Sequence, residues 1–578
     1  MSAQLEQTST EREGRNALAE LIRRASARET ALVGWGARVF SALLLLSLLV
    51  CALHVYAVAR QTPQNSDSVQ GFLEAQSILH GNPFLSGWRL TSDNYLFTDA
   101  PFFVAYQILF GHRVEALAAV PSIIYVLILI ACLAGSVRSF KLSRHNVVAL
   151  ATVVLLIGLP ASRAPSADPL APSAPLFLAD FHAASILFSL VSLILLARLA
   201  QAPNILDRPL LASTVAFSCI LAVGSDPLTV IFAFGPAILV LLIDVVLSGG
   251  ERKYLGLTAL VLFSLAVGLA VPGLISRFGG FHTIPIFGTK FVDAKNLGDN
   301  VRAFSFGLLY SADAYFFGRP LFEIETMANL ARLFGWILGV ASVLWTFSFL
   351  WRHWRQFLLD RMILVSIVTL SAACVLSDQF SLDLRGDIFQ GGRGRVYLTP
   401  IVVLSAVLAA RVIPIAVARL PLRRLQIVAQ AALVAFAAGL VVLQSASLLT
   451  KASSPAWVRD NPYVQAGRWL ETNSLTRGVG GYFDSSIIRA LTDGGVAVNA
   501  VYADAETNGR LKPFLFDTDS RFFSGNSAPM FVIWREGDDP FDWYKVNADT
   551  VEATYGAPTR IEHLPGGFVV EVLREPQH

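Results

Sequence analysis

Long apolar runs constrain the fold of this chain more than any other feature of its sequence. A bilayer core is about 30 Å thick and needs roughly 20 apolar residues in a helix, because lipid cannot satisfy exposed backbone hydrogen-bonding groups. Of the 578 residues, 54% are hydrophobic and only 15% are charged, and the mean hydropathy is +0.56. The sequence predicts a polytopic α-helical membrane protein with about 11 transmembrane helices. The predicted spans lie near 36–58, 113–137, 146–160, 182–199, 210–224, 227–247, 255–275, 332–351, 361–377, 396–413 and 425–449.

Basic residues gather in short segments between alternate apolar runs, and this asymmetry predicts the topology. It places the N-terminal segment 1–35 in the cytoplasm, and an odd number of spans then puts the chain after residue 450 on the opposite side. The net charge of +3, from 45 basic and 42 acidic residues, is too nearly balanced to indicate a nucleic-acid partner. We expect extracytoplasmic loops at 59–112, 161–181, 276–331 and 378–395.

The segment 451–578 differs in composition from the membrane domain 36–450, since Asp, Gly, Asn and Trp replace the Leu, Val and Ala runs. Turn residues separate short apolar stretches, which is typical of a small α/β domain. We therefore expect an extracytoplasmic α/β domain after the last span. Helices are predicted at 463–471, 485–491 and 548–555, and strands before residue 485 and at 496–502, 530–534 and 568–573.

The first long loop carries an amphipathic helix. Apolar residues at 69, 72, 73, 75, 78 and 79 share one helical face, Ser66 or Asp67 is placed to cap the start, and Gly81 to end it. We expect this helix to lie flat on the membrane surface. On this interpretation alone, Asp67 is a helix cap.

The same loop resembles a known family. An Asp just after the first span, a helix that ends in Gly81-Asn82-Pro83, and the segment Pro101-Phe102-Phe103-Val104-Ala105-Tyr106-Gln107-Ile108-Leu109-Phe110-Gly111 resemble the GT-C superfamily of membrane glycosyltransferases. The pattern is similar to the dolichyl-phosphate-mannose-protein mannosyltransferase-like and aminoarabinose-transferase-like branches. Enzymes of this superfamily move a sugar from a polyprenyl-phosphate carrier to an acceptor. The resemblance implies a GT-C-like fold and transfer of a hexose or pentose at the extracytoplasmic face.

The resemblance assigns Asp67 as catalytic base, because a carboxylate within hydrogen-bond reach can take the proton of an attacking acceptor hydroxyl. A single base with in-line displacement implies inversion at the anomeric carbon. Some members carry Glu next to this Asp, whereas Ser68 stands here, so a paired carboxylate is not supported. Asp180, at the mouth of the fourth span, resembles a position where members often have a second acid; interfacial polarity is the alternative.

A phosphate leaving group needs cations. Arg393 and Arg395 lie on the outer side, against the positive-inside trend, in an Arg-x-Tyr-Leu-x-Pro element that also contains Tyr397 and resembles a recurrent family segment. They are candidates for a phosphate clamp, with lipid-headgroup anchoring as the alternative. Ser225-Asp226-Pro227 departs from the Lys-Gly turn that is frequent in the family, and an acid there would repel phosphate. Three further residues complete the predicted substrate site: Asp99, His182 and Lys290.

No cofactor and no metal site are predicted. The residues Cys51, Cys132, Cys219 and Cys374 each sit inside an apolar run, which indicates neither a disulfide framework nor a thiolate metal site. No His, Glu and Asp cluster has metal-ligand spacing. An open alternative is that Asp67 and another loop acid hold a divalent cation.

The leading hypothesis is an inverting glycosyltransferase of the bacterial inner membrane. It would take sugar from a polyprenyl-phosphate donor in the bilayer and pass it to a cell-envelope glycan, lipid or protein. One alternative is a transporter or flippase for a lipid-linked sugar, which predicts charges deep within spans and broken helices. Asp244 is the acid inside a span, and we expect it near the cytoplasmic end, where water solvates it. The other alternative is a non-enzymatic envelope-assembly protein whose C-terminal domain is the functional part.

Overall fold

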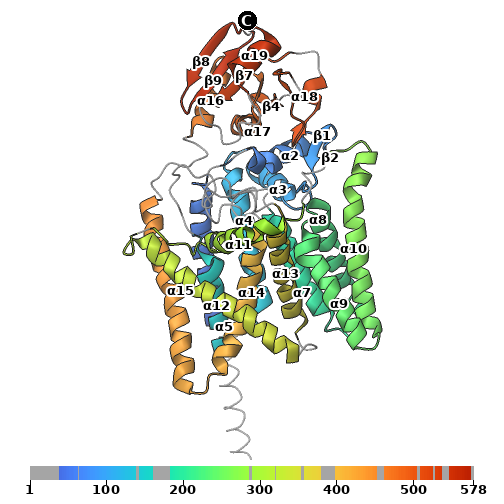
Figure 1. The fold of residues 1–578 in the computed structure, drawn as a ribbon, viewed down its shortest axis with the longest axis vertical. Coiled ribbons are helices and arrows are strands. Elements are labelled where there is room, and N and C mark those ends of the chain that lie inside the picture. Colours follow the sequence, from blue (N-terminus) through green and yellow to red (C-terminus); the bar gives the residue numbers. More distant parts are fainter. Residues whose placement is uncertain are drawn as a thin grey trace, which may run out of the picture.

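Two domains make up the part of the chain that the structure describes, a helical domain and a C-terminal α/β domain (Figure 1). The computed structural model describes residues 38–62, 64, 66–137, 142–160, 182–284, 290–318, 320–352, 357–378, 397–451, 461–503, 508–524, 528–536 and 546–574.

The helical domain contains the predicted spans. Among the residues that the structure describes, eight helices are long and apolar enough to cross a membrane, and three of the shorter apolar helices match the remaining predicted runs. The prediction of a polytopic membrane protein is therefore confirmed. The long helices are Arg38–Ala59, α4 (Ala116–Ser136), η4 with α9 (Val230–Leu247), α10 (Arg252–Arg277), α12 (Ile324–Arg352), α13 (Leu358–Leu376), α14 (Thr399–Ala418) and α15 (Arg423–Lys451). The three shorter ones are α5 with the π-helical η2 (Arg144–Gly158), α7 (Ala183–Leu199) and α8 (Pro209–Ser225).

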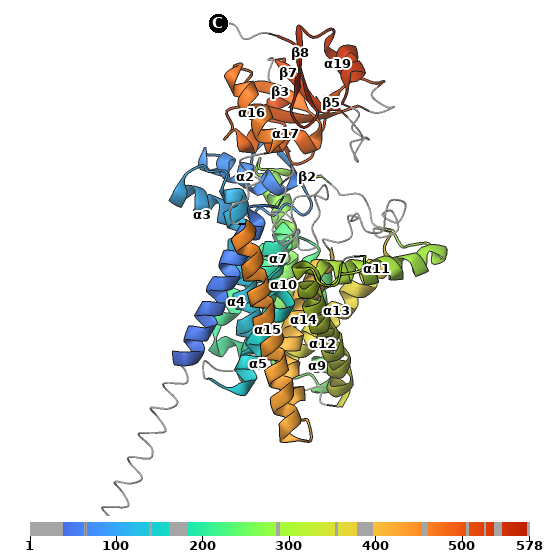
Figure 2. The same ribbon diagram turned by 90° about the vertical axis from the view of Figure 1, so that its left-hand side faces the viewer.

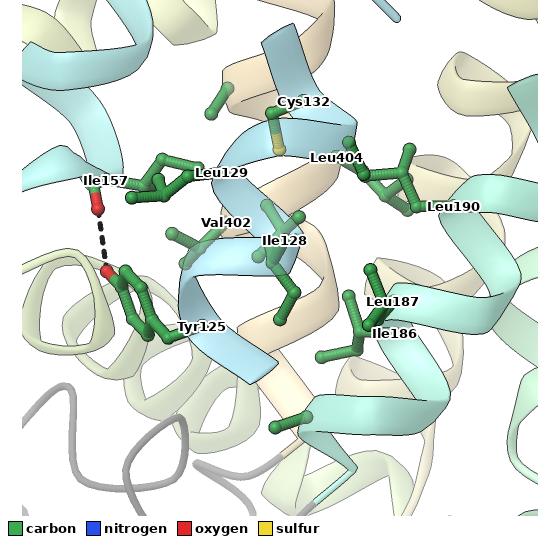
Figure 3. Close-up of a cluster of buried hydrophobic side chains, with 14 of the residues drawn as sticks. Tyr125, Ile128, Leu129, Cys132, Ile157, Ile186, Leu187, Leu190, Val402 and Leu404 are labelled. Atoms are coloured by element: carbon green, nitrogen blue, oxygen red, sulfur yellow. Dashed lines mark hydrogen bonds between the residues drawn. The ribbon is translucent and has the colours of Figure 1, made fainter. Parts of the chain in front are cut away.

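The centre of this domain is packed with aliphatic side chains from α4, η2, α7 and α14 (Figure 3). Cys132 of α4 faces this cluster, and all four cysteines are buried and unbridged. The hydroxyl of Tyr125 donates to the carbonyl of Ile157 at 2.7 Å, which ties α4 to η2. Lipid gives helices no hydrophobic reason to associate, so such packing and interhelical hydrogen bonds hold the bundle together.

The sequence suggested that water solvates Asp244, but the structure shows this acid buried. Its carboxylate is 3% exposed and receives two hydrogen bonds from Arg361 of α13, whose guanidinium is 1% exposed. Asp360 and Arg411 form a second ion pair between α13 and α14. An acid between packed helices needs such a partner, because an unpaired charge there is costly.

One end of the bundle, here called the capped end, carries the long loops and the C-terminal domain (Figures 1 and 2). Its elements in the first loop are η1 (Asp67–Val69), α2 (Gln70–Leu79), β1 (Trp88–Thr91) and α3 (Ala100–Phe110). The later loop adds β2 (His282–Ile284), η5 (Ala294–Asn296) and α11 (Leu297–Ser311), which runs across the bundle. The remaining short element of the helical domain is η3 (Ile205–Asp207), between α7 and α8.

The prediction that the helix α2 lies flat on a membrane surface is wrong. It is sandwiched between α3 and the C-terminal domain, and every residue from Gln70 to Gln76 is buried (Figure 2). Both its apolar and its polar side face protein, which is why the apolar stripe alone suggested the wrong partner. Gly81, with φ of 89°, ends the helix region as expected.

The C-terminal domain is built on a six-stranded sheet of order β5-β4-β3-β7-β9-β8. Strand β3 is parallel to both β4 and β7, and β9 is antiparallel to β7 and β8. The predicted helices and strands all occur, although the second helix begins at Tyr482 and not at Ser485. The strands are β3 (Arg477–Gly480), β4 (Ala497–Tyr502), β5 (Lys512–Pro513), β6 (Thr518–Asp519), β7 (Phe531–Arg535), β8 (Arg560–Leu564) and β9 (Phe568–Val572). The helices are α16 (Pro462–Thr472), α17 (Tyr482–Leu491), α18 (Arg521–Ser524) and α19 (Ala548–Tyr555).

The two domains share a second sheet and a core. Strand β1 of the first loop pairs with β2 on one side and with β6 of the C-terminal domain on the other. Ile487 and Ala490 of α17 belong to the same buried apolar cluster as Phe72 of α2. The C-terminal domain is therefore docked on the first loop through backbone pairing and apolar burial together.

Candidate functional site

Asp67 lies where the first loop meets the C-terminal domain. It is half-buried in η1, and neither η1 nor α2 begins with a side-chain capping hydrogen bond. Its carboxylate Oδ1 instead accepts a hydrogen bond of 2.5 Å from the hydroxyl of Tyr482, the first residue of α17. A phenol that donates to a carboxylate stabilises the ionised form, which is the form a general base needs.

A second acid of the C-terminal domain joins this contact. Asp517 Oδ2 lies 3.5 Å from the Tyr482 hydroxyl, and Asp517 Oδ1 accepts a hydrogen bond of 3.0 Å from the backbone amide of Thr91. Burial, followed by the negative charge of Asp67, raises the pKa of Asp517 well above its usual range. We refer to Asp67, Thr91, Tyr482 and Asp517 as the Asp67 cluster.

Glu74 of α2 lies behind the Asp67 cluster and is only 2% exposed. Burial raises the pKa of Glu74 well above its usual range, and the nearby charges of Asp517 and Asp99 raise it further. Carboxyl groups that share a poorly hydrated region cannot all ionise cheaply. Burial thus favours the protonated form of both Glu74 and Asp517.

A second polar cluster surrounds His182 at the start of α7. His182 has φ of 66° and its Nδ1 lies 2.7 Å from Oδ2 of Asp226, an acid that is fully buried in the turn after α8. The hydroxyl of Tyr95 lies 3.1 Å from the same nitrogen and donates to Asp93 at 3.3 Å. The ring of Tyr397 packs against the imidazole, with ring centres 5.7 Å apart. We refer to these five residues as the His182 cluster.

Asp226 is thus engaged by His182. The sequence analysis expected an acid in this turn to repel phosphate, but here the adjacent imidazole is placed to balance its charge. Ser225 and Asn94 also fix the turn, since the amide of Phe97 donates to Ser225 Oγ at 2.8 Å and Asn94 donates to the Gly224 carbonyl at 2.9 Å. The first loop and the turn after α8 are therefore held together at the His182 cluster.

The two clusters are neighbours. The hydroxyl of Thr91 donates to the backbone carbonyl of Asp93 at 3.0 Å, so one tight turn links a member of each cluster. Burial raises the pKa of Asp93; His182 opposes this shift and the charge of Asp226 adds to it. The charge of Asp93 also acts on Asp517. Asp67, a histidine and several further acids thus share one region of the capped end.

The predicted site residues fall into three groups. His182 and Tyr397 meet in the His182 cluster, and Asp99 is fully buried at the start of α3, where its charge acts on Glu74 and raises the pKa of that residue. Lys290 pairs through its backbone with Asp378, at the end of α13. Asp180, Arg393 and Arg395 lie outside the described residues.

Sequence reasoning missed the contribution of the C-terminal domain. Tyr482 was placed just ahead of a predicted helix, and Asp517 was assigned no role. Neither lies near Asp67 in sequence. The contact depends on the docking of the C-terminal domain, through the pairing of β6 with β1 and the packing of α17 against α2. A neighbouring pattern of aromatic residues, Phe514 and Phe516, is the feature of the sequence that marks this segment as packed.

Metal binding receives no geometric support from these clusters. Among the residues that the structure describes, no group of three or more His, Cys, Asp or Glu side chains is arranged to hold a metal ion. The acids of the Asp67 cluster bind a tyrosine hydroxyl and a backbone amide.

These features define a multi-pass membrane protein in which an α/β domain caps a helical bundle and an acidic site lies where the two meet. No family model and no curated protein matches the chain. Solved structures that match include the crystal structure of ArnT from Cupriavidus metallidurans bound to undecaprenyl phosphate, at 12% identity and a TM-score of 0.50. The apo crystal structure of the same protein matches at 11% identity and the same TM-score.

Both matches cover 94% of this chain and 99% of the ArnT chain, so they include the helical domain and the C-terminal domain together. ArnT is an aminoarabinose transferase, a GT-C glycosyltransferase. This chain therefore shares the fold of these ArnT structures across both of its domains, which agrees with the GT-C-like fold that the sequence resemblance led us to expect.

Proposed function

We propose that this chain is an inverting glycosyltransferase that moves a sugar from a polyprenyl-phosphate donor to a cell-envelope acceptor. The observation that carries the proposal is the half-buried Asp67 carboxylate, held by Tyr482 at the capped end of a GT-C fold. The ArnT structure bound to undecaprenyl phosphate supports a polyprenyl-phosphate partner. A polyprenyl tail dissolves in the bilayer beside the apolar helices while its head group reaches the capped end.

In the proposed reaction, the acceptor hydroxyl attacks the anomeric carbon and Asp67 takes its proton. The bond between the anomeric carbon and the phosphate oxygen breaks, and polyprenyl phosphate leaves. One base and one displacement give inversion. His182 is proposed to orient the head group, since its ring is held in place by Asp226 and Tyr397.

The donor phosphate is assigned to Arg393 and Arg395. The chain enters α14 through Tyr397, which contacts His182, directly after the segment that contains both arginines. This order along the chain supports the assignment of the phosphate clamp to these two arginines. Asp180 is assigned as a second catalytic acid on the strength of the family resemblance alone. Lys290 is assigned a contact to the donor, because the basic and aromatic residues of the loop 276–331 suit closure over a lipid-linked sugar.

The positive-inside pattern supports a bacterial inner-membrane location with the capped end extracytoplasmic. A transporter requires charges or broken helices along a pathway. The charges of the buried pair Asp244–Arg361 and of the partly buried pair Asp360–Arg411 cancel between packed helices. The buried Arg332 donates to Asn329 and to the Leu159 carbonyl, an arrangement that secures a helix end. These contacts favour an enzyme over a transporter.

The test uses the full chain in proteoliposomes. Undecaprenyl phosphate carrying radiolabelled mannose, glucose, arabinose or aminoarabinose is supplied as donor, and extracted envelope lipids and glycans as acceptors. Asp67→Asn should reduce transfer at least ~100-fold, since general-base catalysis contributes roughly 10²–10⁴-fold. Asp293→Asn, a matched change at a carboxylate that is 72% exposed, should leave transfer unchanged.

Near-normal transfer by Asp67→Asn would remove this residue as the base. Movement of the intact donor across the bilayer, with the sugar still attached, would instead establish the transporter alternative. If none of the donors is consumed or moved, a non-enzymatic assembly role for the C-terminal domain would gain support.

A further inference from the structure

Tyr482 reaches Asp67 from the end of a central strand of the C-terminal sheet. It follows β3, which lies between its two parallel neighbours β4 and β7, and it begins α17. In open α/β sheets, ligands bind at the carboxyl ends of strands where the strand order reverses. Because β4 and β7 lie on opposite sides of β3, Tyr482 stands at such an edge, and this edge faces the first loop.

The Tyr482 side chain has little freedom to swing away. It is 1% exposed, and its ring packs edge-on against Phe483, Phe514 and Phe516 with centroid separations of 5.1, 5.3 and 5.4 Å. An aromatic cage of this kind fixes the ring, so the hydroxyl is held at one place. That place is 2.5 Å from Asp67 Oδ1.

The docking of the domain is fixed at several points around this contact. Gln70 of α2 donates to Ser486 at 3.2 Å, and Gln76 of α2 donates to Asp493 at 2.9 Å. Ser486 lies in α17 and Asp493 lies just after it. On the β6 side, Ser520 donates through its hydroxyl to the Gly87 carbonyl at 2.6 Å. Hydrogen bonds on both sides of the contact therefore hold Tyr482 and Asp67 at this distance.

We propose that Tyr482 is a positioning residue for the Asp67 carboxylate, so that the C-terminal domain completes the catalytic centre. This inference rests on the proposed function. The hydroxyl holds one carboxylate oxygen and thereby sets the direction in which the group can accept a proton. Three titratable groups face the contact or lie behind it: Asp517 before β6, Glu74 on α2 and Asp93 after β1.

The first test compares Tyr482→Phe with Tyr463→Phe. Tyr463 is a matched control, because its hydroxyl also donates to a carboxylate, Asp484 at 2.9 Å, but within the C-terminal domain. Tyr482→Phe should lower kcat about tenfold with little change in KM, and should move the acid limb of the pH–rate profile upward by about one pH unit. Tyr463→Phe should match the wild type in all three. A wild-type rate and profile for Tyr482→Phe would overturn the proposal.

A second measurement does not depend on sugar transfer. The infrared difference between the wild type and Asp67→Asn isolates the carboxyl band of Asp67, and its titration can be followed in the full chain without donor. Tyr482→Phe should raise the titration midpoint by about one pH unit, whereas Tyr463→Phe should not. An unchanged midpoint overturns the positioning contact even if transfer is observed; a shifted midpoint without transfer sustains the contact and rejects the proposed function.

Fluorotyrosine at position 482 is a control for the possibility that Tyr482→Phe acts by disturbing the fold. Fluorine makes the phenol a stronger donor while it keeps the ring in its aromatic cage. The Asp67 titration midpoint and the acid limb should then move downward, in the direction opposite to Tyr482→Phe. Equal shifts in the same direction for both variants would mean that the ring, and not the hydroxyl, acts on Asp67, and would overturn the proposal.

Discussion

Arg361 and Asp244 form a buried, two-pronged ion pair between α13 and α9. Nη1 and Nη2 of the guanidinium donate to the two carboxylate oxygens, the second at 2.8 Å, and neither side chain is more than 3% exposed. A guanidinium and a carboxylate joined by two parallel hydrogen bonds give the strongest ion-pair geometry that side chains can form. The pair fixes the two helices in register although it has no place in the proposed chemistry.

Arg361→Met should destabilise the helical domain by about 3–5 kcal/mol, because it leaves the Asp244 charge buried without its partner. The double variant Asp244→Leu with Arg361→Met should recover most of that loss, since it replaces the pair by apolar side chains. Thermal unfolding in detergent measures both. Lys295→Met, which alters a pair that is more than 70% exposed on both sides, should leave the melting temperature unchanged. A double variant as unstable as the single one would mean that the pair itself contributes net stability.

The buried carboxyl group of Glu74 should make the free energy of unfolding depend on pH, with a loss of stability as the pH rises. Burial raises the pKa of Glu74 above the ordinary value of 4.5, so the folded state holds the proton more tightly than the unfolded state. Its contribution is complete below pH 4.5 and is lost as the pH rises through the raised folded-state pKa. Glu74→Gln removes this loss and should raise the melting temperature by about 2 °C at pH 8, with little change at pH 4.

The control for Glu74 is Glu562→Gln, at a side chain that is 40% exposed. It should give the same small difference from the wild type at both pH values. If Glu74→Gln were instead less stable than the wild type at pH 8, Glu74 would be ionised in the folded protein and engaged by a cation.

The membrane architecture could be predicted from the sequence because lipid enforces it. Apolar runs must become helices, so every predicted span is found. The helix predicted at 548–555 also has its expected bounds, and Asn547 caps its start. The contact partners could not be predicted in this way. The apolar face of α2 indicates that this side of the helix is buried. It does not indicate whether lipid, α3 or the C-terminal domain covers that face, because each would bury it equally well.

The same limit applies to the candidate site. Asp67 was found through the family resemblance, whereas Tyr482 and Asp517 come from residues more than 400 positions later in the chain. Their position beside Asp67 depends on the pairing of β1 with β6. These two strands are too short to show a periodic pattern in the sequence. Asp226 was read as a charge that repels phosphate, since its partner His182 belongs to a different span.

The docking of the C-terminal domain can be tested with two glycines that share a backbone conformation but differ in their surroundings. Gly87 and Gly81 have φ of 85° and 89°, so alanine costs about 1–2 kcal/mol of backbone strain at either position. A methyl group on Gly87 would also lie 2.6 Å from Cγ of Arg521, whose guanidinium is held by Asp519, whereas Gly81 has open space around it. Gly87→Ala should therefore loosen the β1–β6 pairing and raise amide exchange of residues 517–521 at least about tenfold, a change of 1.4 kcal/mol. Gly81→Ala should leave that segment at the wild-type rate, and because the Tyr482 contact depends on the docking, Gly87→Ala alone should also slow sugar transfer. Equal exchange in the two variants would show that the first loop and the C-terminal domain are not held together at Gly87.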